Sequence, residues 1–148
     1  LGVLKETIRL DKLRKVKARL NADPIGMVSI CGGCDPPLGM ALMMGFKVCF
    51  YLSVEKYEHT RTVAKGIYPQ IVHVEPHDLM EIDIPRLAQR IIDLNVSKVA
   101  LTSGCPCTPW SRLSTTPLGF NHPLAQLVTR TAELIGLLKA AGILESAK

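Results

Sequence analysis

The residues with the clearest chemical potential form a loop in which a cysteine lies between two prolines. Cys107 follows Pro106 and precedes Pro109, in the stretch 103–111 that comes after the apolar run 98–102. Proline fixes its own φ angle and restrains the residue before it, so this loop is expected to be stiff. A thiol held in this way can act as a nucleophile if nearby donors or a cation lower its pKa. The alternative is a structural loop with inert thiols.

Cysteine placement allows a second kind of chemistry. The chain has five cysteines, an odd number, and no export signal opens it, so free thiols or metal ligands are expected rather than disulfides. They are Cys31, Cys34, Cys49, Cys105 and Cys107. The pairs Cys31/Cys34 and Cys105/Cys107 follow two strands that we expect to be neighbours. Four thiolates could then converge on zinc, although the Cys-x-Cys spacing is tight for such a site.

The net charge of +5 is concentrated at the start of the chain. Residues 1–21 hold seven basic and two acidic groups, whereas residues 22–148 hold eleven of each. The same segment carries apolar residues mostly three or four positions apart: Leu1, Leu4, Ile8, Leu13, Val16 and Leu20. This spacing predicts an amphipathic helix over residues 1–23, ahead of an α/β domain over residues 24–148. Its basic groups are either a solvated face or a surface that approaches phosphates.

Strands and helices alternate along the rest of the chain. The predicted strands are residues 27–30, 48–54, 71–74 and 98–102. The predicted helices are residues 38–44, 57–65 (ended by Gly66), a segment from Pro85 to Leu94, and 122–141. Four such alternations favour a doubly wound parallel sheet with helices on both faces, and ligands of such sheets bind beyond the carboxyl ends of the strands. The apolar runs are far shorter than the ~18 residues that a membrane span requires.

The loop and the residues after the other strands together resemble a known family. Residues 106–111, Pro-Cys-Thr-Pro-Trp-Ser, resemble the Pro-Cys-x-Pro-aromatic-Ser catalytic loop of the DNA cytosine-5 methyltransferases. Residues 29–33, with Leu38 and Gly45, resemble the first cofactor-binding motif, especially that of the de novo methyltransferase branch. The resemblance covers roughly residues 26–141, and its most specific part is the loop.

This resemblance implies a fold, a reaction and a set of site residues. The fold would be an incomplete, mostly parallel, Rossmann-like sheet of the S-adenosylmethionine-dependent methyltransferase type. Cys107, with Pro106 and Ser111 in its loop, would add to carbon 6 of a cytosine flipped out of DNA, and carbon 5 would take a methyl group from S-adenosylmethionine. The expected cofactor-binding residues are Cys31, Gly32, Gly33, Glu55, Lys56, Asp78 and Leu79. No metal is expected at this site.

Two of these cofactor residues are acids with ordinary alternatives. Glu55 could accept hydrogen bonds from ribose hydroxyls, or it could be an acid that favours a helix N-terminus. Asp78 could accept from an adenine amine, or it could be a turn residue. The glycines would let a cofactor approach the backbone, or they could form a plain turn.

The sequence also departs from the family pattern. Cys31 replaces a phenylalanine of the first motif, Pro36 and Pro37 replace later glycines, and Thr108 replaces a glutamine or asparagine. The Glu-Asn-Val motif that follows the catalytic loop in the family does not occur before Lys148. We therefore expect little methyl transfer by this chain alone. The alternative function is a catalytically inactive methyltransferase-like fold that serves as a structural subunit of a larger assembly.

The expected partners and compartment depend on which function holds. The partner would be DNA for an enzyme and other protein subunits for an assembly factor. Free thiols favour a reducing compartment inside the cell, which would be the nucleus for a eukaryotic DNA methyltransferase.

Overall fold

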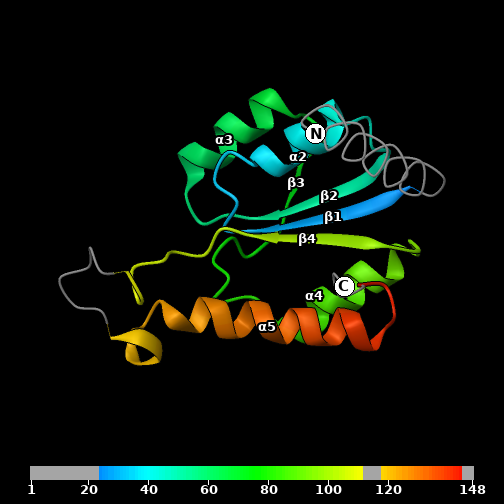
Figure 1. Cartoon of the computed structure of the whole chain (residues 1–148). Coiled ribbons are helices and arrows are strands. Elements are labelled where there is room, and N and C mark those ends of the chain that lie inside the picture. The colour runs from blue at the N-terminus through cyan, green and yellow to red at the C-terminus, as the bar shows by residue number, and fades with distance from the viewer. Residues whose placement is uncertain (1–23, 112–117, 145–148) are drawn as a thin grey trace, which may run out of the picture.

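Four parallel strands form one sheet that lies between two pairs of helices (Figure 1). The computed structural model describes residues 24–111 and 118–144. The strands, in the spatial order β3-β2-β1-β4, are β1 (Ile25–Ile30), β2 (Val48–Val54), β3 (Val72–His73) and β4 (Val99–Ser103). The helices are α2 (Pro36–Met43), α3 (Glu58–Ile67), α4 (Ile84–Asp93) and α5 (Ala125–Ala140), and a short 3-10 helix, η1 (Gly119–Asn121), precedes α5.

The α/β class and the parallel sheet agree with the sequence-based prediction, whereas several boundaries differ. Helix α2 begins at Pro36 rather than at Leu38, because proline fits the first turn of a helix, where its missing N–H costs no hydrogen bond. Gly66 lies inside α3 instead of ending it. The last helix starts at Ala125, and η1 takes up part of the preceding segment.

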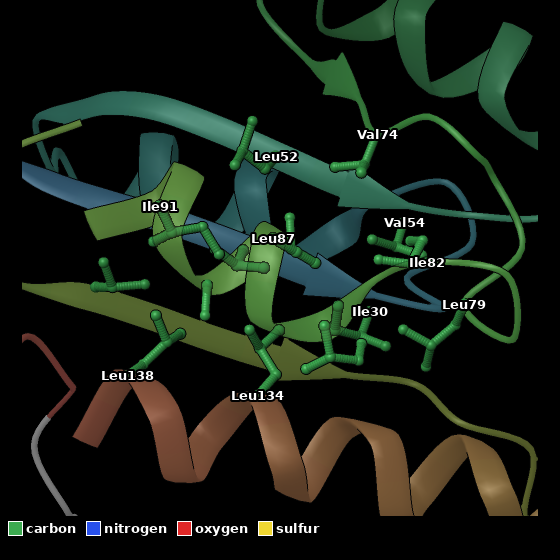
Figure 2. Close-up of a cluster of buried hydrophobic side chains, with 14 of the residues drawn as sticks. Ile30, Leu52, Val54, Val74, Leu79, Ile82, Leu87, Ile91, Leu134 and Leu138 are labelled. Carbon is green, nitrogen blue, oxygen red and sulfur yellow. The ribbon is translucent and has the colours of Figure 1, made fainter. Parts of the chain in front are cut away.

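Successive side chains of β1, which lies between β2 and β4, point to opposite faces of the sheet, so the hydrophobic core has a part on each face. Val28 and Ile30 of β1 belong to the larger of two clusters of buried hydrophobic side chains, together with residues of α4 and α5. Figure 2 shows Ile30 within this larger cluster. Met27 points to the other face and packs with Leu38 of α2 and Tyr51 of β2. Because β1 has neighbours on both sides and is covered on both faces, all six of its residues are buried.

The helices of the larger cluster are fixed at their ends as well as by their apolar faces. Helix α4 starts at an N-cap, Asp83, whose carboxylate accepts from the Arg86 N–H at 3.0 Å. The Arg130 guanidinium of α5 donates to the carbonyls of Leu79 (2.8 Å) and Ile82, which lie in the loop before α4. Helix α5 therefore also holds the segment that follows β3.

Two sequence-based predictions concern parts of the chain beyond these elements. The predicted helix over residues 1–23 lies outside the described residues. Among the helices in residues 24–111 and 118–144, none has the length and apolar character needed to cross a bilayer.

The larger cluster gives a direct test of this arrangement. Leu134 of α5 is completely buried, whereas Leu137 on the same helix is 37% exposed. We expect Leu134→Ala to lower the free energy of unfolding by about 2–5 kcal/mol, because it removes buried methyl groups and leaves a cavity. Leu137→Ala should lower it by about 1 kcal/mol or less. Urea unfolding of both variants measures the difference, and equal losses would contradict the described packing of α5.

Candidate functional site at the carboxyl ends of the strands

The loops that follow β1 and β4 lie side by side at one edge of the sheet. The Cys31 N–H donates to the carbonyl of Val54 at 2.8 Å, and the Gly104 N–H donates to the carbonyl of Ile30 at 2.8 Å. These bonds continue the strand ladders by one residue beyond β1 and β4. The edge is also where the chain changes direction across the sheet, since β2 lies on one side of β1 and β4 on the other. Ligands of open α/β sheets bind at such a point.

The turn after β1 is built on left-handed backbone angles. Cys31, Gly33 and Asp35 have φ angles of 54°, 62° and 55°. A Cβ atom on Gly32 would lie 2.0 Å from the Ser29 hydroxyl oxygen and 2.3 Å from an Asp35 carboxylate oxygen. Only glycine fits at position 32, so this residue sets the path of the turn.

Glu55 ties this turn to the end of β2. Its Oε2 atom accepts from the Gly33 N–H at 3.0 Å, and its Oε1 atom accepts from the Tyr57 N–H at 3.0 Å. The residue is only 6% exposed. A carboxylate offers about four lone-pair positions, so two remain for ribose hydroxyls. The residues after β1 and β2 are therefore chemically suited to a ribose, and the carboxylate already has a structural role.

A buried acid that the sequence analysis did not identify lies beneath the same turn. Asp35 is fully buried, and its carboxylate accepts from the Tyr51 hydroxyl at 3.1 Å and from the Ser53 hydroxyl at 2.8 Å. Burial raises the pKa of Tyr51 above its ordinary value, so this phenol remains a donor. An aspartate directly before a helix is a recognisable N-cap signal, yet here no side-chain cap bond forms and the carboxylate points into the protein.

Asp78 forms its contacts with neighbouring protein groups. Its Oδ2 atom lies 2.7 Å from the Lys56 ammonium, and its Oδ1 atom accepts from the Met80 N–H at 3.0 Å. The Lys56 bond first, and the Met80 N–H second, hold the pKa of Asp78 below its ordinary value. The Leu79 side chain is 2% exposed and packs in the larger cluster. Leu79 thus contributes to the core.

The Cys31 and Cys105 thiols are adjacent, and they join the two loops. Burial first, and the neighbouring Cys105 second, raise the pKa of Cys31 to about 12, so this thiol is protonated at neutral pH. The Cys105 sulfur lies 3.1 Å from the Ser103 hydroxyl oxygen and 3.6 Å from that of Thr131 on α5. Cys31 and Cys105 both pack against the larger cluster and are partly buried, so their thiols are less accessible than an exposed thiol.

Cys107 is exposed, two residues further along the same loop. Its carbonyl accepts from the Trp110 N–H at 3.0 Å and from the Ser111 N–H at 2.9 Å, which closes a tight turn. Pro109 is buried within this turn. The Trp110 ring meets Phe120 of η1 edge-on, with 5.5 Å between ring centroids. The loop is therefore anchored on both sides of an accessible thiol.

The structure assembles some of the predicted residues and separates others. Gly33 meets Glu55, Lys56 meets Asp78, and Cys31 meets Cys105. Within residues 24–111 and 118–144, the Cys107 thiol has no hydrogen-bond partner. The four cysteines of the predicted zinc site do not converge. In the part of the chain that the structure describes, no group of three or more His, Cys, Asp or Glu side chains is placed to hold a metal ion.

No protein-family model matches this sequence, and no curated protein matches it.

The crowding around Gly32 predicts the effect of adding one methyl group. We expect Gly32→Ala to lower the free energy of unfolding by about 1–3 kcal/mol, because the new Cβ would overlap the Ser29 and Asp35 side chains. Gly66→Ala is the matched control, since a Cβ there meets nothing within 4 Å and the position lies inside α3. Chemical unfolding should show the control unchanged or more stable by up to about 1 kcal/mol. A neutral Gly32→Ala would contradict the described turn.

The lowered pKa of Asp78 predicts a contribution to stability that depends on pH. The carboxylate is favoured in the folded protein, so its contribution is fully present above the unfolded-state pKa, near 3.8, and is lost as the pH falls through the lower folded-state pKa. Lys56→Gln removes the main cause of the shift. Thermal unfolding between about pH 2 and about pH 6 should show a smaller loss of stability in acid for this variant. An unchanged pH profile would show that Lys56 does not stabilise the Asp78 carboxylate.

Proposed function

We propose that this chain is the cofactor-and-nucleophile half of a DNA cytosine-5 methyltransferase-like protein, of the Rossmann-like methyltransferase type, with Cys107 as its nucleophile. The observation that carries the proposal is the position of Cys107. Its thiol is accessible and lies on an anchored turn that follows β4. Strand β4 pairs with β1, so this turn lies beside the glycine turn that follows β1. Ligands of open α/β sheets bind at this edge.

The proposed chemistry assigns a separate task to each part of this edge. The Cys107 sulfur forms a bond to carbon 6 of an extruded cytosine, and the electron pair of the 5,6 double bond moves to carbon 5. S-adenosylmethionine supplies the methyl group that carbon 5 takes. A water molecule then takes the proton from carbon 5, and the electron pair of that carbon–hydrogen bond restores the double bond as the sulfur leaves carbon 6 as a thiolate. Pro106 and Pro109 restrict the loop, so that the thiol is positioned before the base arrives.

The residues after β1 and β2 would hold the cofactor. The two free lone-pair positions of Glu55 suit the ribose hydroxyls, and the Gly32–Gly33 turn lets a ligand approach the backbone. Asp78 would have to exchange its bond with Lys56, or share it, to accept from adenine.

A duplex that contains 5-fluorocytosine at the target position tests the nucleophile. Fluorine at carbon 5 cannot leave as a proton does, so the bond between the sulfur and carbon 6 should persist and give a denaturation-stable adduct with the full chain and S-adenosylmethionine. We expect Cys107→Ser to abolish the adduct and Cys105→Ser to retain it, because the Cys105 sulfur is partly buried and already bonded to hydroxyls. Absence of any adduct, or an adduct that survives Cys107→Ser, would overturn the assignment.

A second candidate function, a non-catalytic subunit of a larger assembly, is favoured by a different observation. Both acids expected to bind the cofactor already bond to protein groups: Glu55 to two backbone N–H groups, and Asp78 to Lys56 and Met80. Calorimetric titration of the full chain with S-adenosylmethionine separates the two functions. Binding that is lost in Glu55→Gln would favour the enzyme, and absence of binding would favour the assembly subunit.

A further inference from the structure

An apolar groove lies on the face of the sheet opposite α5. It has a volume of about 530 Å³, and its walls come from α2 and the loop after it, from β1 and β4, and from two residues outside these elements, Lys98 before β4 and Ile143 after α5. Ile25 and Met27 of β1 and Ala100 of β4 line its floor, and Met40 and Met44 on one side belong to α2 and its C-cap. We call this hollow the α2–β4 groove.

The groove exists because the two faces of the sheet are covered unequally. On the face of α4 and α5, the buried cluster extends from β2 across β1 to β4. On the other face, α2 and α3 cover β1 and β2 (Figure 1). Ala100 of β4 is only partly buried against the smaller hydrophobic cluster on this face, which contains Met27, Leu38 and Tyr51. Ala100 lies directly beside Met27 in the parallel register, and its small side chain leaves the floor low. Among the described residues, no helix covers this part of β4.

The exposed apolar residues around the groove indicate that it is a docking surface. Met40 is 63% exposed and Met44 is 41% exposed, although both belong to an apolar wall. Lys98, at one end, is the charged residue among those that line it. An apolar patch with little charge selects an apolar occupant, because burial of a charge there would cost solvation energy.

We propose that the α2–β4 groove is covered by the N-terminal segment of this same chain, with Leu13, Val16 and Leu20 packed into it. In a helix these three side chains fall within an arc of about 60°. Arg14 and Lys15 then lie on the opposite side, toward solvent. The segment thus offers an apolar stripe to an apolar groove and a basic face to water.

The position of the segment in the chain supports this occupant. The strand whose first residue lines the groove, β1, begins at Ile25, directly after the segment. A connection of about four residues, 21–24, is a normal length between a helix and the strand that follows it, and it is short enough for a helix to turn back along the sheet. A helix that ends near residue 20 would therefore run back along the face on which Ile25 and Met27 lie.

The lengths also agree. The β4 side of the groove extends from Lys98 to Thr102, a distance of about 13 Å at the usual rise of a strand. Leu13 and Leu20 are seven residues apart, which corresponds to about 10.5 Å along a helix. The stripe therefore matches the groove in length. This inference does not depend on the proposed methyltransferase function.

Hydrogen–deuterium exchange on the full chain tests the proposal from the side of the groove. An isolated helix of this length is marginal in water, so slow exchange within residues 10–20 would report docking. We expect Met40→Glu to speed exchange in residues 10–20 by about tenfold or more. Met43→Glu is the matched control: it makes the same change on the same helix at a position that is 90% exposed and does not line the groove. The control should exchange like the unmodified chain.

Variants in the segment provide the reciprocal test. Val16→Lys places a charge on the docking stripe, whereas Ala18→Lys places the same charge about 160° away around the helix. We expect the first variant to speed exchange both in residues 10–20 and in the peptides that contain Ala100 and Met44. The second variant should change neither.

Two outcomes would overturn the proposal. The first is unprotected exchange of residues 10–20 in the unmodified chain. The second is a dimer, measured by light scattering, that Met40→Glu converts to a monomer while residues 10–20 stay unprotected. That result would assign the groove to a second copy of the chain.

Discussion

Two carboxylates fix the glycine turn after β1 to the end of β2, and the other groups of the carboxyl edge take their positions from this attachment. The Glu55 carboxylate accepts hydrogen bonds from two backbone N–H groups, that of Gly33 in the turn and that of Tyr57 at the start of α3. Asp35 lies beneath the turn and accepts two hydroxyls from β2. Buried carboxylates without hydrogen bonds would be costly, so the turn, the strand and the first residues of two helices are coupled.

The edge therefore combines rigidity with accessible chemistry. The thiol pair of Cys31 and Cys105 closes the space between the two loops, and the exposed thiol of Cys107 lies beyond it. This arrangement suits a site in which a structural wall supports one reactive group. In the proposed enzyme, a bound cofactor would therefore share Glu55 with the backbone. The enzyme and the assembly subunit differ in whether that sharing occurs.

Sequence patterns predicted the larger features because those features have local causes. Short apolar runs separated by helical spacing gave the parallel sheet, and the position of Cys107 after β4 followed from it. The partners of the acids could not be predicted in the same way. Asp35 meets Tyr51 and Ser53 only because β2 pairs with β1 in a register that depends on the whole core. The Lys56–Asp78 pair likewise depends on how two loops approach each other. The four cysteines of the predicted zinc site also lie in different surroundings, since Cys31 and Cys105 pack against the core whereas Cys34 and Cys107 are exposed.

The unequal environments of the thiols have a consequence for covalent reagents. Electrophiles and peroxides attack the thiolate, and they must first reach it. Cys34, Cys49 and Cys107 are open to solvent, whereas the Cys31 sulfur is partly buried and keeps its proton at neutral pH. The thiols therefore differ in reactivity according to their position in the fold. An electrophilic probe or a peroxide should therefore modify the exposed cysteines and leave Cys31, where the loops after β1 and β4 meet, unmodified.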